Sequence, residues 1–371
     1  MNITREICSS PYSCYLNLTS KCNLRCKHCF GSYSVEIKNE LKMEDWKDVI
    51  NQLIKLKVFF INISGGEPTQ CPYFREFIEY LNYIGMHFII TTNGVFSKEV
   101  REFIIKNKEY LIGIKISLDG PDSKSHGFIR LDAKGKYNPN LFKITLENIN
   151  FFKKKNIPLT IATVLHSENI KKITKLEKLI KKINPISWFI SPLIPIGRGE
   201  ANNFIFKQYE YFNMSFWRNL KERGLKNKIN VNLIDMPSTE KLNLSAYSCP
   251  AALNFCEIHS DGTISPCPLC RICIPPKFMK FENIKQKTIP EIWNGKAFNK
   301  FRGLMNRGCN GCRMLHKCNK CIPQSFIYFK NGTSPTPFCI KNGENLGLKN
   351  LKQLKEQLKE NCGINLNANI K

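Results

Sequence analysis

The sequence predicts an α/β fold, namely a partial (β/α)6 TIM-like barrel followed by a small cysteine-rich domain. From residue 12 to about 194, short apolar, β-branched runs alternate with longer amphipathic runs, which is typical of a parallel sheet covered by helices. Near residue 235 this alternation stops, and Cys, Pro and Gly become frequent. The length of 371 residues exceeds the size at which one core usually stops growing, so we expect a large domain and a smaller one.

Each predicted β-α unit contains a strand-like run and a longer helical run. The strands are expected at residues 12–19, 58–66, 87–94, 111–120, 159–166 and 186–194. The helices are expected near residues 43–57, 72–84, 98–107, 139–155, 169–184 and 207–224. In α/β barrels the functional groups lie on the loops that follow the strands, so those loops are where we expect the site.

Changes in composition divide the chain into three parts. Residues 1–235 form the predicted barrel, 236–342 the cysteine-rich domain, and 343–371 a C-terminal helix and tail. The amphipathic run at 344–360 is most simply a helix that packs on the rest of the protein. Because the cysteine-rich part cannot build much of an apolar core, we expect bound metal to supply its order.

The seventeen cysteines are too many for an ordinary soluble enzyme. The first residues are polar, without the apolar stretch of a signal peptide, and no window approaches the roughly 18 apolar residues of a membrane span. We therefore expect a cytoplasmic protein, in which thiols stay reduced. Clustered cysteines in that compartment indicate metal binding rather than disulfides.

The formal charge of +26 arises from 56 Lys and Arg against 30 Asp and Glu. Such an excess can indicate a nucleic-acid partner. Here Lys is spread along nearly every amphipathic segment, basic runs are short, and no RNA-binding signature is present. The charge is therefore interpreted as a general bias of composition, and nucleic acid is not the expected partner.

Three cysteines with the spacing C-x3-C-x2-C directly follow the first predicted strand. Cys22, Cys26 and Cys29 lie on one tight loop and are followed by the aromatic Phe30. Three thiolates can hold three irons of a cubane cluster and leave the fourth iron without a protein ligand. The alternative is a zinc site, for which His28 is the nearest fourth ligand but is poorly placed inside the triplet.

The triplet resembles the cluster loop of the radical SAM superfamily. The resemblance implies that S-adenosylmethionine chelates the fourth iron of a [4Fe-4S] cluster and is cleaved to a 5'-deoxyadenosyl radical. The ends of later strands are similar to the cofactor-binding segments of this family in the expected order: SGGEP, TTNG, SLDG with HGFIR, and SPLIPIGRG. Carried over to this chain, the cofactor contacts fall on Gly65, Gly66, Glu67, Asn93, Ser117, Arg130 and Ile196.

Specific roles follow from this resemblance. The glycines would let backbone carbonyls approach the ligand, and Glu67 would accept from its cationic amine. Ser117 and Arg130 would contact the ribose and carboxylate, and the segment around Ile196 would pass the adenine. The structural alternatives are a tight turn at GGEP, a turn hydroxyl at Ser117 and a surface guanidinium at Arg130.

The second cysteine region has an informative spacing. Cys249 is followed by Gly262 and Cys267, then by a C-x2-C-x5-C-x2-C run that starts at Cys309, and finally by Cys339. This pattern resembles the SPASM extension of radical SAM maturases, except that two residues rather than three precede the last cysteine of the run. A zinc ribbon at 309–321 is the alternative.

The resemblance implies two auxiliary [4Fe-4S] clusters. The first would be held by Cys249, Cys256, Cys267 and Cys321, and the second by Cys309, Cys312, Cys318 and Cys339. Together with Cys267, however, Cys270 and Cys273 form a C-x2-C-x2-C motif, so either could replace Cys256 in the first cluster. The remaining cysteines are Cys8, Cys14, Cys71 and Cys362.

These resemblances imply hydrogen abstraction from a peptide or protein, followed by oxidation or crosslinking. Formylglycine formation of the sulfatase-maturase type is less favoured, because Pro268 stands where those enzymes have an Asp that acts as the catalytic base. The first rival is a radical enzyme that acts on a small cofactor or tetrapyrrole precursor. The second is a non-catalytic iron-sulfur electron carrier. No catalytic residue is assigned.

The partners follow from the same interpretation. About a dozen residues precede the first strand, whereas peptide-modifying members often begin with a leader-recognition domain. We therefore expect a separate leader-recognition protein, or recognition by the barrel itself, and the positive charge would suit an acidic leader. An external electron donor such as flavodoxin or ferredoxin is also expected.

Overall fold

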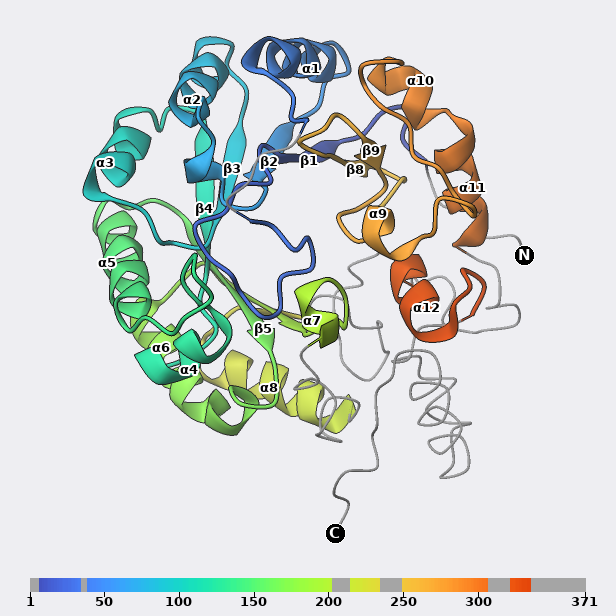
Figure 1. Cartoon of the computed structure of the whole chain (residues 1–371). Coiled ribbons are helices and arrows are strands. Elements are labelled where there is room, and N and C mark those ends of the chain that lie inside the picture. Colours follow the sequence, from blue (N-terminus) through green and yellow to red (C-terminus); the bar gives the residue numbers. More distant parts are fainter. Residues whose placement is uncertain (1–6, 35–38, 202–213, 234–248, 306–320, 335–371) are drawn as a thin grey trace, which may run out of the picture.

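The computed structural model describes residues 7–34, 39–201, 214–233, 249–305 and 321–334. Among these residues nine strands form one sheet, and helices surround the outer side of its curve (Figure 1). The predicted α/β partial barrel is thereby confirmed. No helix of the described residues is long and apolar enough to cross a lipid bilayer.

The six predicted strands are all present and pair in parallel in chain order. They are β1 (Ser13–Asn17), β2 (Phe60–Ser64), β3 (Phe88–Thr92), β4 (Leu111–Ser117), β5 (Leu159–Leu165) and β6 (Ser187–Pro192). Three further strands extend the sheet. β7 (Val231–Leu233) pairs in parallel with β6, β8 (Phe255–Ile258) pairs in parallel with β1, and β9 (Ile264–Ser265) pairs antiparallel with β8.

The helices of the barrel lie where the amphipathic runs predict them, and residues 207–213 of the last predicted helix lie outside the described residues. They are α1 (Met43–Lys55), α2 (Phe74–Tyr83), α3 (Lys98–Lys106), α5 (Asn140–Lys154), α6 (Ile173–Ile183) and α8 (Met214–Lys226). Two short helices were not predicted, α4 (Ser123–Ile129) and α7 (Arg198–Ala201). Both are too short to show a clear apolar period, and both follow strands at the edge where the site is expected.

The cysteine-rich part is not a separate layer, because β8 continues the barrel sheet beside β1. Its helices are α9 (Cys270–Cys273), α10 (Ile289–Trp293), α11 (Lys296–Leu304) and α12 (Ile322–Phe329), which lie beside β8 and β9 (Figure 1). The expectation that this part lacks an apolar core is wrong within residues 249–305, since Trp293, Phe298 and Phe301 are buried in the same core cluster as the barrel.

The predicted domain boundaries lie outside the described residues. The first falls between residues 235 and 236, the second between 342 and 343, and the expected helix at 344–360 lies beyond the second. The division into three parts therefore stays a prediction. What the structure does describe is one continuous sheet that connects the barrel to the cysteine-rich part.

Alternation along β1 separates an apolar face from a polar face. Cys14 and Leu16 are buried in the core cluster that contains Trp46 of α1. Successive side chains of a strand point to opposite faces, so Tyr15 and Asn17 point to the interior of the barrel. There the hydroxyl of Tyr15 accepts from Lys115 Nζ at 3.3 Å. The interior is thus polar enough to receive a ligand.

The core can be tested with two isoleucines of β4. Ile116 is 0% exposed and Ile112 is 40% exposed. We expect Ile116→Ala to lower the free energy of unfolding by about 2–5 kcal/mol, because it removes buried methyl groups and leaves a cavity. Ile112→Ala should change it by about 0.5 kcal/mol or less. Urea unfolding followed by circular dichroism measures both, and equal losses would contradict the assigned faces of β4.

Candidate active site

The cysteine triplet lies on the loop that directly follows β1. Cys22 and Cys26 are each 8% exposed, and Cys29 is half-buried. Burial raises the pKa of the Cys22 thiol to about 12. It also raises the pKa of the Cys26 thiol to about 11, although Arg130 opposes that rise. Since buried thiolates need nearby positive charge, this donor set fits a cluster that brings iron cations with it.

The end of α4 and the residues that follow it fix the backbone of the cysteine loop. Arg25 N donates to Leu131 O at 2.9 Å, and Lys27 N donates to Ile129 O at 2.8 Å. These bonds lie on either side of Cys26. The loop therefore depends on the β4 unit for its shape.

Arg198, at the start of α7, holds the same loop from the β6 side. Its Nε donates to Cys26 O at 2.9 Å, and its Nη1 donates to Tyr33 O at 2.7 Å. The preceding Gly197 has a φ of +56°, and a Cβ there would lie 2.2 Å from Phe30 O. Sequence reasoning did not select Arg198. The feature that could have identified it is its position between two glycines after a predicted strand.

Gly65 and Gly66 let the end of β2 approach the start of the cysteine loop. A Cβ on Gly65 would lie 2.4 Å from Thr19 O, and one on Gly66 would lie 2.4 Å from Lys21 O. Both positions therefore require glycine. The contacts in the structure are with the protein backbone, and the predicted contact with a cofactor remains a prediction.

Glu67 connects the ends of two neighbouring strands. Its Oε1 accepts from Thr69 N, Thr69 Oγ1 and Thr92 Oγ1, and its Oε2 accepts from Asn93 N at 2.8 Å. The side chain is fully buried, and these four bonds offset the cost of burying its carboxylate, with three on Oε1 and one on Oε2. Glu67 therefore ties the end of β2 to the end of β3, and the expected bond from a cationic amine stays a prediction.

Asn93 lies against the cysteine loop, as its selection from the TTNG segment implied. Its Nδ2 donates to Asn23 Oδ1 at 2.8 Å and lies 4.0 Å from Cys22 Sγ. Ser117 is half-buried at the end of β4, and among the described residues its hydroxyl has no hydrogen-bond partner. Ile196 is buried in the loop after β6. Their predicted contacts with a cofactor stay predictions.

Arg130 is buried, so the alternative of a surface guanidinium is wrong. Its Nε donates to Asp119 Oδ2 at 2.6 Å, and its Nη1 lies 4.0 Å from Cys26 Sγ. Burial would raise the pKa of Asp119, but Arg130, together with the neighbouring histidines and the bond from Val164 N, lowers that pKa to about 2. Asp119 is therefore ionised and holds the guanidinium beside a thiol of the triplet.

Three buried histidines surround Asp119, and sequence reasoning missed their convergence. Burial lowers the pKa of His28 and of His126 to about 3, and that of His166 to about 4, so all three are neutral near pH 7. His28 Nε2 lies 3.7 Å from Asp119 Oδ2. Within the described ranges no three His, Cys, Asp or Glu side chains converge closely enough to hold a single metal ion.

The cysteines of the second region lie in two places. Cys256 lies in β8 with its Sγ 3.5 Å from Cys14 Sγ, whereas Cys267 Sγ lies 3.3 Å from Cys270 Sγ. Cys321 precedes α12 as its N-cap residue. Four predicted ligands and one unassigned cysteine lie outside the described residues, namely Cys309, Cys312, Cys318, Cys339 and Cys362.

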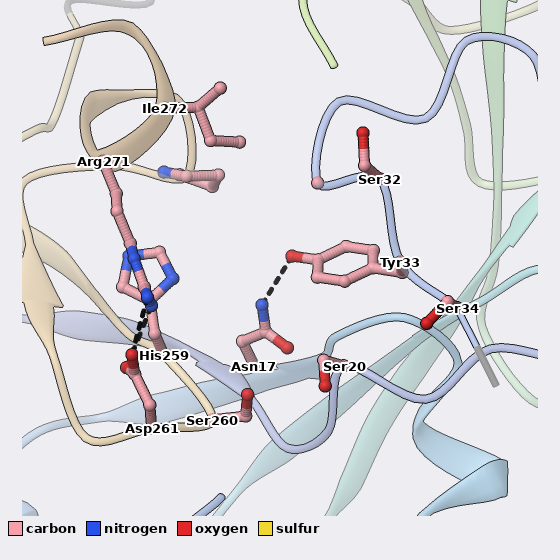
Figure 2. Close-up of a pocket in the computed structure, with 12 residues that line it drawn as sticks. Asn17, Ser20, Ser32, Tyr33, Ser34, His259, Ser260, Asp261, Arg271 and Ile272 are labelled. Carbon is pink, nitrogen blue, oxygen red and sulfur yellow. Dashed lines mark hydrogen bonds and ion pairs between the residues drawn. The ribbon is translucent and has the colours of Figure 1, made fainter. Parts of the chain in front are cut away.

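A pocket of about 380 Å³ lies between the two groups of cysteines. Figure 2 shows one wall formed by the segment that follows Cys29, and the opposite wall formed by the β8–β9 hairpin and α9. The lining is mostly polar and consists of Asn17, Ser20, Gly31, Ser32, Tyr33, Ser34, His259, Ser260, Asp261, Pro268, Arg271 and Ile272.

His259 presents a hydrogen-bond acceptor to this pocket. The hydroxyl of Ser265 donates to Cys267 O at 3.0 Å, so it must accept from His259 Nε2, which lies 2.8 Å away. Burial lowers the pKa of His259 to about 3, and Arg271 adds to this effect. The ring is therefore neutral with its proton on Nε2, and Nδ1 remains an acceptor.

Tyr33 presents a donor from the opposite wall. Its hydroxyl oxygen accepts from Asn17 Nδ2 at 2.5 Å. In the described part of the chain the hydroxyl proton has no acceptor of its own. Beside His259, Arg271 Nη1 and Nη2 bind Asp261 at 2.9 and 2.6 Å, so its charge is largely compensated. The pocket thus offers neutral hydrogen-bonding groups on both walls.

Comparison with known proteins gives two family matches. Residues 16–180 match the Radical SAM superfamily, and residues 249–322 match the SPASM family, described as an iron-sulfur cluster-binding domain. The two matches lie on the barrel and on the cysteine-rich part, respectively. They cover the triplet and four of the cysteines proposed for the auxiliary clusters and described in the structure.

Individual relatives span most of this chain. The AdoMet-dependent heme synthase of Methanosarcina barkeri is 24% identical over 87% of this chain and 94% of its own length. Mycofactocin maturase MftC of Mycolicibacterium smegmatis is 25% identical over 90% of this chain and 83% of its own. Streptococcus suis SuiB, solved with S-adenosylmethionine, superposes with a TM-score of 0.70 at 19% identity, covering 89% of this chain and 77% of that one. SuiB has also been solved with the precursor peptide SuiA.

The ion pair at Asp119 can be tested by its removal. We expect Asp119→Ala to lower the free energy of unfolding by about 3–5 kcal/mol, because the buried guanidinium of Arg130 loses its counter-charge. Asp48→Ala, at an exposed position of α1, is the control and should change stability by about 0.5 kcal/mol or less. Urea unfolding of the anaerobically purified protein measures both. A loss below about 1 kcal/mol for Asp119→Ala would contradict this role.

Proposed function

Because the chain belongs to the radical SAM superfamily and carries a SPASM iron-sulfur domain, we propose that it is an enzyme that abstracts hydrogen from a peptide or protein substrate. The modification would be an oxidation or a crosslink. The observation that carries the proposal is the polar pocket between the two groups of cysteines, with Tyr33 on one wall and His259 on the other. A substrate bound in this pocket would lie close to the first group of cysteines, where the radical is generated, and also close to the second group.

The proposed cofactors are a [4Fe-4S] cluster that binds S-adenosylmethionine and two auxiliary [4Fe-4S] clusters. Cys22, Cys26 and Cys29 would hold the first, and their burial on one loop fits that group. When bound, it supplies the electron that cleaves S-adenosylmethionine to a 5'-deoxyadenosyl radical. Arg130 and Asn93 place N–H donors 4.0 Å from Cys26 Sγ and Cys22 Sγ, where they would stabilise thiolates.

The pocket supports a peptide because its groups match those of an amide. A peptide unit has one N–H donor and one carbonyl acceptor. His259 Nδ1 can accept from the N–H, while the Tyr33 hydroxyl can donate to the carbonyl, and Ser32 and Ser260 also line the pocket. Neutral partners suit a neutral ligand, since neither wall leaves an uncompensated charge.

Other parts of the proposal concern partners and chemistry. The charge of +26 would attract an acidic leader sequence, recognised by the barrel or by a separate protein. An electron donor such as flavodoxin or ferredoxin would reduce the first cluster. Pro268, on the pocket wall, has no group that accepts a proton, so formylglycine formation with a base at this position is not supported.

A second candidate is action on a tetrapyrrole precursor. It is favoured by the heme synthase relative, which matches along 94% of its own length. The pocket argues against it. A macrocycle would need broad apolar walls, whereas of the twelve lining residues only Pro268 and Ile272 have purely aliphatic side chains. We therefore rank it below a peptide.

Substrate assays separate these candidates. Reduced, reconstituted enzyme with S-adenosylmethionine should convert a peptide encoded beside its gene to a product lighter by a few hydrogens. The formation of 5'-deoxyadenosine should rise in step with product, as mass spectrometry and chromatography would measure. Enzyme without reductant is the control. Uncoupled 5'-deoxyadenosine with every peptide, together with loss of mass from a porphyrin substrate, would contradict the peptide proposal.

The pocket can be tested through the Tyr33 hydroxyl. Tyr33→Phe keeps the ring and removes the donor, so kcat/KM for the peptide should fall by about 3- to 10-fold, the value of one lost hydrogen bond. Iron content should not change. Tyr83→Phe, at a position that is 87% exposed, is the matched control and should behave as wild type. An unchanged kcat/KM in Tyr33→Phe would remove this group from substrate binding.

A further inference from the structure

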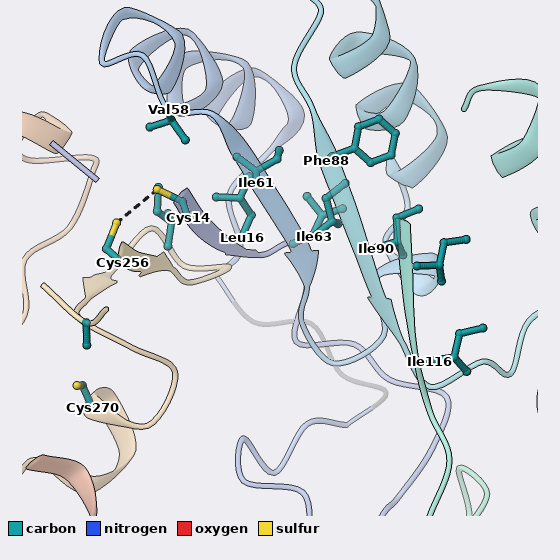
Figure 3. Close-up of a cluster of buried hydrophobic side chains, with 14 of the residues drawn as sticks. Cys14, Leu16, Val58, Ile61, Ile63, Phe88, Ile90, Ile116, Cys256 and Cys270 are labelled. Carbon is teal, nitrogen blue, oxygen red and sulfur yellow. Dashed lines mark hydrogen bonds between the residues drawn. The ribbon is translucent and has the colours of Figure 1, made fainter. Parts of the chain in front are cut away.

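The face of β8 on which each side chain lies decides which cysteines can meet. Cys256 and Cys14 are opposite each other in the parallel register of β8 and β1, and their sulfurs are 3.5 Å apart. Both are 0% exposed and lie in the apolar core cluster with Leu16 and Ile258. Figure 3 shows the two thiols pointing toward each other. Cys256 is therefore on the apolar face of the sheet.

Cys267 lies on the opposite side of the same hairpin. Glu257 pairs with Ser265 across β8 and β9, so these two side chains share a face, while Cys256 is on the other. The Ser265 hydroxyl binds both His259 and the carbonyl oxygen of Cys267, so the backbone of Cys267 lies beside this face. For Cys256 to bind the same cluster as Cys267, the register of β8 would have to shift by one residue. That shift would move all the apolar side chains of β8 to the polar face.

Cys270 is on the side of Cys267. The two sulfurs are 3.3 Å apart, and Cys270 begins α9. α9 packs against α12, and Cys321 is the residue at the start of α12. Figures 1 and 3 show α9 next to α12, and Cys270 apart from the Cys14 and Cys256 pair. Cys273 ends α9, and among the described residues its sulfur makes no hydrogen bond.

We propose that Cys270, rather than Cys256, completes the first auxiliary cluster with Cys249, Cys267 and Cys321. The assignment rests on the proposed function for the presence of that cluster. The thiol chemistry of the four residues fits a cubane with four cysteine ligands. Cys256 is then a structural residue that packs with Cys14 between the barrel and the cysteine-rich part.

Iron content tests the assignment in a background without the first cluster. Cys22, Cys26 and Cys29 are all replaced by Ala, so that only auxiliary irons are counted, and about eight are expected for two cubanes. Cys270→Ala should lose about four irons and the matching sulfide. Cys256→Ala should keep the parent count. The two substitutions are matched because both thiols are 0% exposed.

Serine variants keep the test valid where the loss of a cluster unfolds the cysteine-rich part. Serine can bind iron through oxygen, so Cys270→Ser should alter the EPR spectrum of the reduced protein, and Cys256→Ser should not. Iron loss or a changed spectrum at Cys256, with Cys270 silent, would overturn the assignment. A parent count near four would remove one cluster from the proposed function and leave the comparison of variants intact, whereas a count near zero would overturn both.

Discussion

The parallel pairing of β8 with β1 is the constraint on which the rest of the site depends. β1 carries the triplet loop at its carboxyl end, and β8 leads through a tight hairpin to Cys267. Because β8 pairs with β1 and the β8–β9 hairpin turns back from it, the loop after β1 and the segment that begins after Cys267 form the two walls of one pocket. The pocket between them is therefore a consequence of strand pairing, and it does not require two domains to dock by their surfaces alone.

Buried polar groups give this edge its precision. Glu67 binds the ends of β2 and β3 together, and Asp119 holds Arg130 beside the triplet. Each carboxylate is satisfied by bonds from neighbouring units, which offsets the cost of burying its charge. The neutral histidines around Asp119 add no charge of their own. The cysteine loop is thus shaped by a nearly charge-balanced frame, and cationic iron would be the main charge brought into it.

The regular elements could be predicted from sequence because they depend on local patterns. All six barrel strands were found from apolar runs, and most helices from their apolar period. The pairing of β8 with β1 could not, since it joins residues about 240 apart, and nothing in FCEI specifies its neighbour. Arg198 and the histidines were missed for the same reason. No local sequence pattern marks any of them, and they come together only where the ends of four strands meet in the folded protein.

Spacing and side-chain direction are different kinds of information, and the first auxiliary cluster shows where they diverge. The interval between Cys249 and Cys267 identifies a family pattern, but it does not say which face of a strand an intervening cysteine occupies. In β8 that face is fixed by Cys14, Ile258 and the pairing with Ser265. A cysteine packed into the apolar layer stabilises the connection between β8 and β1. Cys256 therefore contributes to the core and is not directed toward a cluster. The proposed ligand, Cys270, comes instead from the turn after Cys267, where the two sulfurs lie 3.3 Å apart.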